Sequence, residues 1–351
     1  MTTTMLAAVY HANQGLQLEK VPIPATGPDG VLIRVENASI CGTDLRIVHG
    51  QHRKYPPGTV RIPGHEMVGV IAEVGGHIPE LSKGQRVFIA PNWGCGHCKQ
   101  CISGQNNLCV HYQAIGVTID GAFAEYVRIP AEAVQQGNII PLNEGVDPFV
   151  AALAEPFACV LRGQNAVGIR PGEVVVVMGA GPIGLMHLKL AHLRGAGKVV
   201  MSEPNPDRLN YAIHLGIDRA VNPSKDDLRT ILDTETHGRG ADVVIVAAPS
   251  RQAQELAVLI AGIGGRINFF GGLPKENSIV AVDGNLVHYK ELVLTGTTAC
   301  STSDCWQAAE IVNSGRIDLS DLVTGKFPLA QVEQAFKAAE DGKSLKVVIQ
   351  P

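Results

Sequence analysis

A chain of 351 residues is too long for one ordinary hydrophobic core and predicts two domains. The composition, 45% hydrophobic and 18% charged, is typical of globular proteins, and a formal net charge of -4 gives no electrostatic reason to expect nucleic acid as a partner. The chain does not open with a secretory signal, and no apolar run reaches the roughly 20 residues that span a bilayer. We therefore expect no membrane association and a cytoplasmic location, with the 8 cysteines as thiols or metal ligands.

The first part of the chain, residues 1–152, is expected to form a compact β-rich domain. Short apolar runs such as 30–35 and 67–74 are separated by Gly and Pro, and few long helical patterns occur between them. Turn residues at this density are typical of short strands. Residues 90–112 stand out within this domain as a cysteine-rich lobe.

The lobe holds four cysteines within 15 residues, with the spacing C-x2-C-x2-C-x7-C: Cys95, Cys98, Cys101 and Cys109. Four thiolates at such spacing can enclose one tetrahedral zinc and leave no open coordination position. An iron–sulfur centre also takes four cysteines, but its ligand spacings differ from these. The lobe therefore predicts a structural zinc.

Residues 153–290 show alternating strand and helix patterns. Apolar strands are expected at 174–178, 198–203, 220–221, 242–246 and 266–270, with helices at 183–194, 207–215, 226–235 and 251–261. This alternation predicts α/β architecture with a doubly wound parallel sheet. The C-terminal segment, residues 291–351, begins with a strand at 292–295 that completes this sheet. It continues with helices at 304–313 and 329–340 and a strand at 345–349, and returns to the first domain.

A glycine-rich turn follows the first of these apolar strands and opens a helix. In its G-x-G-x-x-G pattern, Gly179 permits the tight turn, Gly181 allows a pyrophosphate to approach the backbone, and Gly184 allows close packing of helix on strand. Pro182 and Ile183 begin the helix, whose free N–H groups would face the phosphates. A turn of this kind without a ligand is the alternative, but its context favours a dinucleotide site.

Glu203 ends the second strand of this domain, close to the expected separation from the glycines. A carboxylate there accepts hydrogen bonds from the adenosine ribose and repels a 2′-phosphate, which favours NAD over NADP. Arg208 follows shortly after and would either pair with a phosphate or stack on adenine.

The chain resembles the zinc-containing medium-chain alcohol dehydrogenases over essentially its whole length. The resemblance rests on Gly64-His65-Glu66-x2-Gly69-x5-Gly75-x2-Ile78, on Cys41-Gly42-Thr43-Asp44, on the four-cysteine lobe and on the turn 179–184. Residues 153–156, Leu-Ala-Glu-Pro, look like the polyol (sorbitol) dehydrogenase branch and, less closely, threonine dehydrogenase. The resemblance implies a GroES-like catalytic domain, a Rossmann insertion with NAD at the cleft, and a homodimer or homotetramer.

A second, catalytic zinc is expected from this resemblance, with four ligand candidates: Cys41, His65, Glu66 and Glu155. A thiol, an imidazole and carboxylates form a suitable mixed set that leaves room for an exchangeable water. The zinc would stabilise an alkoxide while hydride leaves the carbon. By resemblance Thr43 passes the proton outward, and Asp44 is an ion-pair partner. We interpret the three remaining cysteines as packing thiols: Cys159, Cys300 and Cys305.

The resemblance implies a polyol-like substrate whose secondary alcohol is oxidised by NAD to a ketone. Polyol dehydrogenases usually carry a Tyr shortly after the first zinc cysteine and an Arg-Tyr pair near 297–300, and both are missing here. The loop 46–54 is instead basic, and three of its side chains would bind a phosphate or carboxylate unless the loop is simply solvated: Arg46, His49 and Arg53.

We therefore predict a neutral polyol dehydrogenase, with alternatives of two kinds. The first is a dehydrogenase of a phosphorylated or acidic polyol, or of a threonine-type amino alcohol, although Glu155 stands where the threonine branch more often has Asp. The second is a non-catalytic scaffold that binds NAD and zinc, which has no need of an open zinc site.

Overall fold

The computed structural model describes residues 3–12, 14–76, 78 and 80–351, which divide into two compact units. Unit 1 comprises Met1–Ala158 and Ala299–Pro351, and unit 2 comprises Cys159–Thr298. The predicted boundaries at 152 and 290 lie a few residues before these. Helix α5 (Ala154–Val167) runs across the first boundary.

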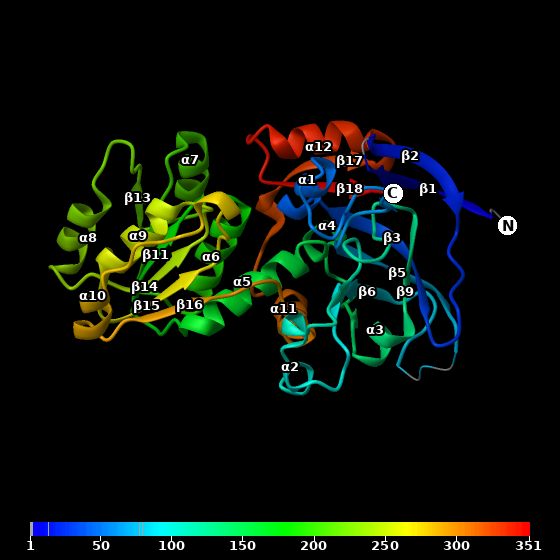
Figure 1. The fold of residues 1–351 in the computed structure, drawn as a ribbon, viewed down its shortest axis with the longest axis horizontal. Coiled ribbons are helices and arrows are strands. Elements are labelled where there is room, and N and C mark those ends of the chain that lie inside the picture. Colours follow the sequence, from blue (N-terminus) through cyan, green and yellow to red (C-terminus); the bar gives the residue numbers. More distant parts are fainter. Residues whose placement is uncertain (1–2, 13, 77, 79) are drawn as a thin grey trace. The chain divides into compact units, whose positions relative to one another are not determined.

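The main sheet of unit 1 has seven strands in the order β10-β6-β5-β3-β18-β17, with β9 paired to β3. The C-terminal strand pairs antiparallel with β3, opposite the residues that precede the Cys41 segment. Two segments far apart in the sequence, β3 and the C-terminal strand β18, therefore meet in one sheet (Figure 1). The strands are β3 (Val31–Ser39), β5 (Glu66–Val74), β6 (Arg86–Ile89), β9 (Tyr126–Ile129), β10 (Ile139–Pro141), β17 (Val323–Pro328) and β18 (Lys346–Gln350).

Two smaller sheets and several short helices complete unit 1. The sheets have the orders β2-β1-β4 and β7-β8, with β1 (Thr4–His11), β2 (Gly15–Pro22), β4 (Val60–Arg61), β7 (Asn92–Trp93) and β8 (Gln113–Ala114). The α-helices besides α5 are α1 (Gly42–Val48), α2 (Lys99–Ile102), α3 (Ala131–Gln135), α4 (Pro148–Ala151), α11 (Thr302–Asn313) and α12 (Val332–Glu340). Phe336 of α12 packs edge-to-face on Phe123, with ring centroids 5.7 Å apart, and so covers the sheet core.

Unit 2 is a six-stranded parallel sheet in the order β13-β12-β11-β14-β15-β16. The order reverses at β11, so right-handed crossovers place helices on both faces, and the predicted α/β class is confirmed (Figure 1). The strands are β11 (Val174–Met178), β12 (Lys198–Ser202), β13 (Arg219–Val221), β14 (Ala241–Val246), β15 (Ala261–Phe269) and β16 (Val293–Gly296). The helices are α6 (Pro182–Leu193), α7 (Pro206–His214), α8 (Leu228–Thr236), α9 (Arg251–Ile260) and α10 (Gly284–Tyr289).

The prediction for residues 251–270 was wrong at one boundary. The helix ends at Ile260 and β15 begins at Ala261, five residues before the expected strand start at 266. The glycines at 262, 264 and 265 carry no side chains, so the early part of this strand shows no apolar alternation. A register shift between Ala241 and Val243 accommodates the irregular pairing there.

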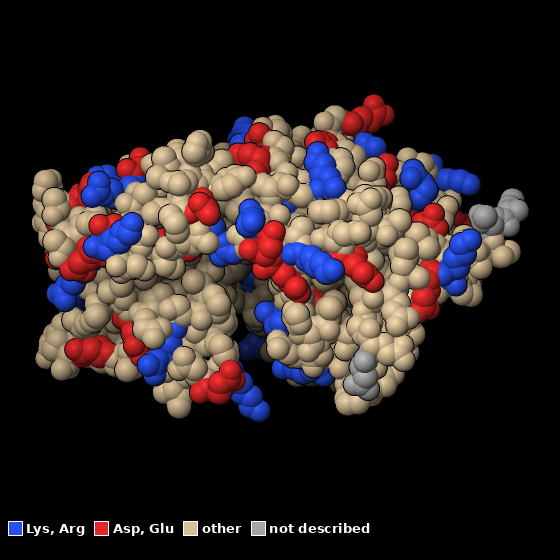
Figure 2. Space-filling model, turned by 90° about the horizontal axis from the view of Figure 1, so that it is seen from above, with Lys and Arg blue, Asp and Glu red and all other residues tan. Residues whose placement is uncertain are grey.

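Charges of both signs are spread over the surface. On the face shown in Figure 2, Lys and Arg side chains are interspersed with Asp and Glu, in keeping with 29 cationic and 33 acidic residues in the chain. Among the described residues, no helix is both long and apolar enough to cross a membrane.

Candidate functional site

The four cysteines of the lobe converge on one point. The sulfurs of Cys95, Cys98, Cys101 and Cys109 lie within 4.8 Å of one another. Cys98 Sγ is 3.5 Å from Cys101 Sγ and 3.8 Å from Cys109 Sγ. A zinc tetrahedron with zinc–sulfur distances of about 2.3 Å needs sulfurs about 3.8 Å apart, so the cluster fits this metal.

Backbone N–H groups of the lobe favour the thiolates of Cys95 and Cys109, whereas burial raises the pKa of Cys101 to about 12. The N–H groups of Cys95 and His111 donate to Cys109 Sγ at 3.4 and 3.3 Å. A backbone hydrogen bond from His97 lowers the pKa of Cys95 to about 6. Because zinc binds the thiolate, these donors lower the cost of deprotonation before the metal enters.

A second group of ligand atoms forms where β3 and β5 end. Cys41, His65 and Glu66 bring one ligand atom each within 4.8 Å of one another. Ser39, the last residue of β3, pairs with Glu66, the first of β5. This register places the loop with Cys41 beside the loop with His65, although the two are far apart in sequence.

Asp44 ties these two loops together from a fully buried position. One carboxylate oxygen accepts from the Cys41 N–H at 2.9 Å, and the other accepts from the Gly64 N–H at 3.3 Å. Asp44 was predicted to be an ion-pair partner, and the nearest cationic group in the structure is His65, whose Nδ1 lies 3.5 Å away, longer than a good hydrogen bond. Gly64 itself has a φ of +98°, and a Cβ there would lie 2.9 Å from Phe123, so glycine is required.

The charges around His65 favour a bound cation. Burial alone would lower the pKa of His65, but the Asp44 carboxylate and the Cys41 sulfur raise it well above its usual value. Negative groups that stabilise a proton on a buried imidazole would also stabilise a zinc ion bound there instead of the proton. The donor set and its surroundings therefore fit the predicted catalytic zinc.

Glu66 is engaged in a buried ion pair that the sequence did not predict. Its Oε2 accepts from Ser39 Oγ and from Lys346 Nζ, and Lys346 also donates to the Ile40 carbonyl at 2.9 Å. Glu66 is 1% and Lys346 is 4% exposed. The one available signal was a lysine at the start of the otherwise apolar strand 345–349, because a buried lysine needs an anionic partner.

Glu155 is the second residue of α5 and is also buried. Burial raises the pKa of its carboxyl, while neighbouring His65 lowers it. Cys300 Sγ lies 3.5 Å from Glu155 Oε1. Sequence reasoning treated Cys300 as a packing thiol and missed this contact, because nothing in the chain connects residues 145 positions apart before folding.

The structure separates the three predicted substrate side chains of the basic loop. Arg46 Nη2 donates to Thr43 Oγ1 at 3.0 Å, next to the predicted ligand Cys41. His49 instead pairs with Glu340 at the end of α12, with 2.8 Å between Nε2 and Oε1, and Arg53 is exposed. Of these three, Arg46 is the cation that the fold brings to the site.

His52, on the same loop, is half-buried near the metal set. Burial and the positive charge of Arg46 lower its pKa, and His65 and Asp44 are among the charges that act on it. A neutral imidazole in this position can accept a proton at neutral pH.

In unit 2 the glycine turn has the geometry of a phosphate site. Gly179 follows β11 with a φ of +107°, and a Cβ on Gly184 would lie 1.8 Å from the Gly179 carbonyl oxygen. Gly181 caps α6, with Pro182 at the first helical position, and a Cβ on Gly181 would meet no atom within 4 Å. The helix N-terminus therefore faces open space that a pyrophosphate can occupy.

Glu203 is held against this turn. Its two carboxylate oxygens accept from the Ala180 N–H at 2.7 Å and from the Asn205 N–H at 2.9 Å. The carboxylate is buried at the end of β12, the position expected for a ribose-binding acid. Arg208 lies in the first turn of α7, where its N–H bonds to Asn205 Oδ1 at 3.2 Å.

Comparison with known proteins identifies a dehydrogenase domain in each of the two parts of the chain. Residues 27–140 match the alcohol dehydrogenase GroES-like domain, and residues 182–314 match the zinc-binding dehydrogenase domain. The chain is 34% identical over 353 residues to an L-threonine 3-dehydrogenase of Mesorhizobium japonicum, with 99% of both chains covered. The chain belongs to the zinc-dependent medium-chain dehydrogenase family.

Solved structures of the family share the fold closely. A putative zinc-binding dehydrogenase from Sinorhizobium meliloti, bound to NADP, has a TM-score of 0.90 at 30% identity, with 100% of both chains covered. An alcohol dehydrogenase from Escherichia coli CFT073, complexed with NADH, has a TM-score of 0.90 at 27% identity and the same coverage. This dehydrogenase is therefore a zinc- and NAD(H)-dependent oxidoreductase, as the sequence predicted.

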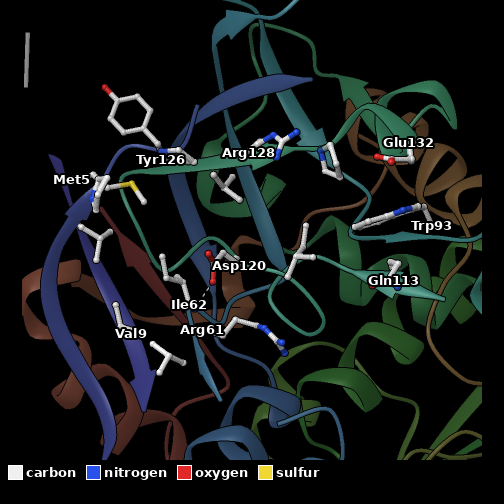
Figure 3. A pocket seen from close by; sticks show the side chains of 18 residues that line it. Met5, Val9, Arg61, Ile62, Trp93, Gln113, Asp120, Tyr126, Arg128 and Glu132 are labelled. Atoms are coloured by element: carbon white, nitrogen blue, oxygen red, sulfur yellow. Dashed lines mark hydrogen bonds between the residues drawn. The ribbon is translucent and has the colours of Figure 1, made fainter. Parts of the chain in front are cut away.

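A separate cavity of about 760 Å³ lies in the β-rich part of the dehydrogenase's unit 1 (Figure 3). Met5, Val9 and Trp93 supply apolar walls, and Asp120 on the wall accepts from the Ile62 N–H at 3.0 Å. Arg61 reaches this cavity but already donates to the Val117 carbonyl at 2.6 Å. None of the predicted metal, cofactor or substrate residues is among those that line it.

Proposed function

We propose that this dehydrogenase oxidises the secondary alcohol of a small substrate that also carries an anionic group, with a β-hydroxy amino acid of the threonine type as the first candidate. The observation that carries the proposal is the hydrogen bond from Arg46 to Thr43, 3.0 Å long, beside the predicted ligand Cys41. It places a permanent positive charge next to the residue that would handle the substrate hydroxyl.

The curated relatives support an amino-acid substrate better than a neutral polyol. Relatives named L-threonine 3-dehydrogenase, from Mesorhizobium japonicum, Bacillus velezensis and Chelativorans, are 32–34% identical to this chain over 99% of its length. A carboxylate beside the reacting alcohol, as in threonine, matches the cation that the structure brings to the site. The neutral polyol favoured by the sequence offers Arg46 no such partner.

NAD, held at the glycine turn 179–184 and Glu203, would supply the hydride acceptor for oxidation of the alcohol carbon, and the hydroxyl proton would leave separately. Zinc, bound by Cys41 and His65 with Glu66 and Glu155 beside them, would supply the Lewis acidity that stabilises the alkoxide. Thr43 Oγ1 would receive the hydroxyl proton. Arg46 stays protonated and cannot relay it, so it would orient Thr43 and bind the substrate anion.

His52 would then take the proton toward solvent. Its pKa is lowered by burial and by Arg46, so the ring is neutral and able to accept a proton at neutral pH. The opposite charge of a bound carboxylate would offset part of the influence of Arg46 on this ring. Proton removal and substrate binding thus depend on the same cation.

A direct test measures NAD reduction with L-threonine, a neutral alditol, an alditol phosphate and an aldonate, for the native enzyme and for Arg46→Ala. We expect L-threonine to be oxidised with a higher kcat/KM than the neutral alditol. Loss of one hydrogen bond to a charged group, about 1.5–3 kcal/mol, should lower kcat/KM for the anionic substrate about ten- to a hundredfold.

Two controls sharpen this test. Arg53→Ala removes an exposed cation of the same loop that has no described contact with Thr43, but its charge, like that of Arg46, lowers the pKa of His52, so kcat/KM should change much less than in Arg46→Ala. A neutral secondary alcohol should lose much less than the anionic substrate in Arg46→Ala. Preference for a neutral alditol, or equal losses on charged and neutral substrates, would contradict the proposal. A preference for the alditol phosphate would support an anionic substrate but would contradict an amino acid as that substrate.

A further inference from the structure

Cys300 is a buried thiol that donates a hydrogen bond to Glu155. Its side chain is fully buried, and its Sγ lies 3.5 Å from Glu155 Oε1. In this hydrogen bond the thiol is the donor and the carboxylate oxygen is the acceptor. The contact joins the start of α5 to the segment that leads into α11.

Two other described neighbours of Cys300 are compatible with this direction of the hydrogen bond. Asn92 Nδ2, which can only donate, lies 3.7 Å from Cys300 Sγ and bonds to the Cys300 carbonyl oxygen at 3.0 Å. Cys305 Sγ lies 3.4 Å from Cys300 Sγ. With the Cys300 proton directed at Glu155, a hydrogen bond between the two thiols would have Cys305 as its donor.

The backbone around Cys300 is tightly constrained. Ala299, just before it, has a φ of +52°, in the left-handed region that residues with a Cβ rarely adopt. Ser301, just after it, caps α11 in a reciprocal pair of hydrogen bonds with Asp304. A strained residue persists only where the surrounding structure holds it, and such residues are concentrated at functional sites.

Asn92 anchors Cys300 from the opposite side. Its Oδ1 accepts from Tyr112 Oη at 2.6 Å, and its carbonyl oxygen accepts from Asn106 Nδ2 at 3.0 Å and Asn138 Nδ2 at 2.7 Å. A thiol that only fills space needs no such network. The position of Cys300 is set by polar contacts, which is the arrangement expected of a residue that orients another.

Glu155 contributes no atom to the close group that the other predicted ligands form in the described part of the chain, although His65 and Glu66 are near enough to act on its charge. The group of ligand atoms within 4.8 Å of one another comprises Cys41, His65 and Glu66, without Glu155. The carboxylate of Glu155 lies instead beside the Cys300 thiol. Because a hydrogen bond to a carboxylate oxygen lowers its electron density, the thiol and a metal ion would compete for Glu155.

We propose that Cys300 is a positioning residue of the metal centre that holds Glu155 back from the zinc and so keeps a coordination position open for the substrate alcohol. The inference rests on the proposed role of Cys41, His65 and Glu155 around the catalytic zinc. According to this inference, a thiol from the C-terminal segment sets the position of one carboxylate ligand.

Zinc affinity of the full-length enzyme, with zinc retained in the four-cysteine lobe, tests the proposal without reference to turnover. Cys300→Ala should lower the Kd for the second zinc about two- to tenfold, the size of one ordinary hydrogen bond, because a thiol is a weak donor and its loss releases Glu155 to the metal. Cobalt placed in this site should show an absorption spectrum of higher coordination number. Cys300→Ser keeps a donor and should match the native enzyme in both measurements.

A matched control and a double-mutant cycle separate this role from simple packing. Cys305→Ala removes an equally buried thiol but leaves the bond to Glu155, so the Kd should stay within about twofold of the native value. In a Glu155→Ala background, Cys300→Ala should no longer change the Kd. Weaker zinc binding, an unchanged Kd and cobalt spectrum, or the same change in both backgrounds would overturn the proposal.

Failure of this inference can be told apart from failure of the proposed function. If Cys41→Ser retains the second zinc, the metal set itself is wrong. If Cys41→Ser loses that zinc while the cycle shows no coupling between Cys300 and Glu155, the metal set stands and only the role of Cys300 is wrong.

Discussion

The four-cysteine lobe and the catalytic set gather metal-binding side chains in the same unit, but they are assembled in opposite ways. The lobe takes all its ligands from 15 consecutive residues. The predicted catalytic set takes Cys41, His65 with Glu66, and Glu155 from three separate segments, and its partners Cys300 and Lys346 come from the C-terminal part of the chain. Local spacing is enough to specify the first site, whereas strand pairing creates the second.

This difference predicts what each site contributes. The lobe closes on its metal with four like ligands and has little apolar core of its own, so its zinc should matter for stability. The predicted catalytic set has mixed ligands and lies beside two further buried charges, Asp44 and Lys346. Such a site should lose activity when a ligand is changed and stability when a charge is left unpaired.

The largest effect is expected for Cys41→Ser. Loss of a Lewis acid that supplies several kcal/mol should lower kcat/KM at least about a thousandfold. Elemental analysis should show a fall from about two zinc ions per chain to about one, while thermal unfolding changes little. Cys305→Ser, a buried thiol outside the ligand set, should retain both ions. A Cys41 variant that keeps both zinc ions would show that Cys41 is not a ligand of the second zinc.

Lys346→Met tests whether buried charge supports the catalytic set. The variant leaves the Glu66 carboxylate buried without its cation, which should cost about 3–5 kcal/mol in the free energy of unfolding. Urea denaturation measures this cost. Adding Glu66→Gln to the same chain should recover a large part of it, because the uncompensated charge is gone. A loss below about 1 kcal/mol would show that water reaches this ion pair.

Cys98→Ser should reverse the pattern seen for Cys41. The lobe would lose its zinc and about 2–4 kcal/mol of stability, comparable to the loss of a cross-link. The kcat/KM of the protein that remains folded should stay within a few-fold of the native value, since the lobe supplies no ligand to the catalytic set. An equal loss of turnover in Cys98→Ser and Cys41→Ser would mean that the two sites are coupled.

The smallest effect is expected at the glycine turn 179–184. This site lies between the two metal sites in character, because a local motif is joined there by one more distant carboxylate, Glu203. NAD should outperform NADP because Glu203 would meet the 2′-phosphate with a like charge. Glu203→Gln keeps the shape and removes the charge, so the ratio of kcat/KM for the two cofactors should fall about tenfold. A native preference for NADP would show that Arg208 dominates over the acid.

The fold class and the family were predictable from the chain because their evidence is short-range. The apolar run before Gly179, the helix pattern after it, and the GHE segment at 64–66 each lie within one element or one turn, and the structure and the relatives agree with the predicted architecture. The start of β15 at Ala261 escaped prediction because a glycine-rich strand shows no alternation of side chains.

The sequence by itself determined which residue types are available for chemistry: four closely spaced thiols, a cysteine and a histidine of family type, a glycine turn and a basic loop. Only the tertiary structure decided how they are used. It paired Lys346 with Glu66, placed Cys300 against Glu155 and turned His49 to Glu340, whereas the contact of Arg46 with Thr43 lies within one turn of α1. The physical reason is that metal spacing and turn geometry are encoded over a few residues, whereas a buried charge or thiol acquires its partner only when β18 and α11 return to the first strands.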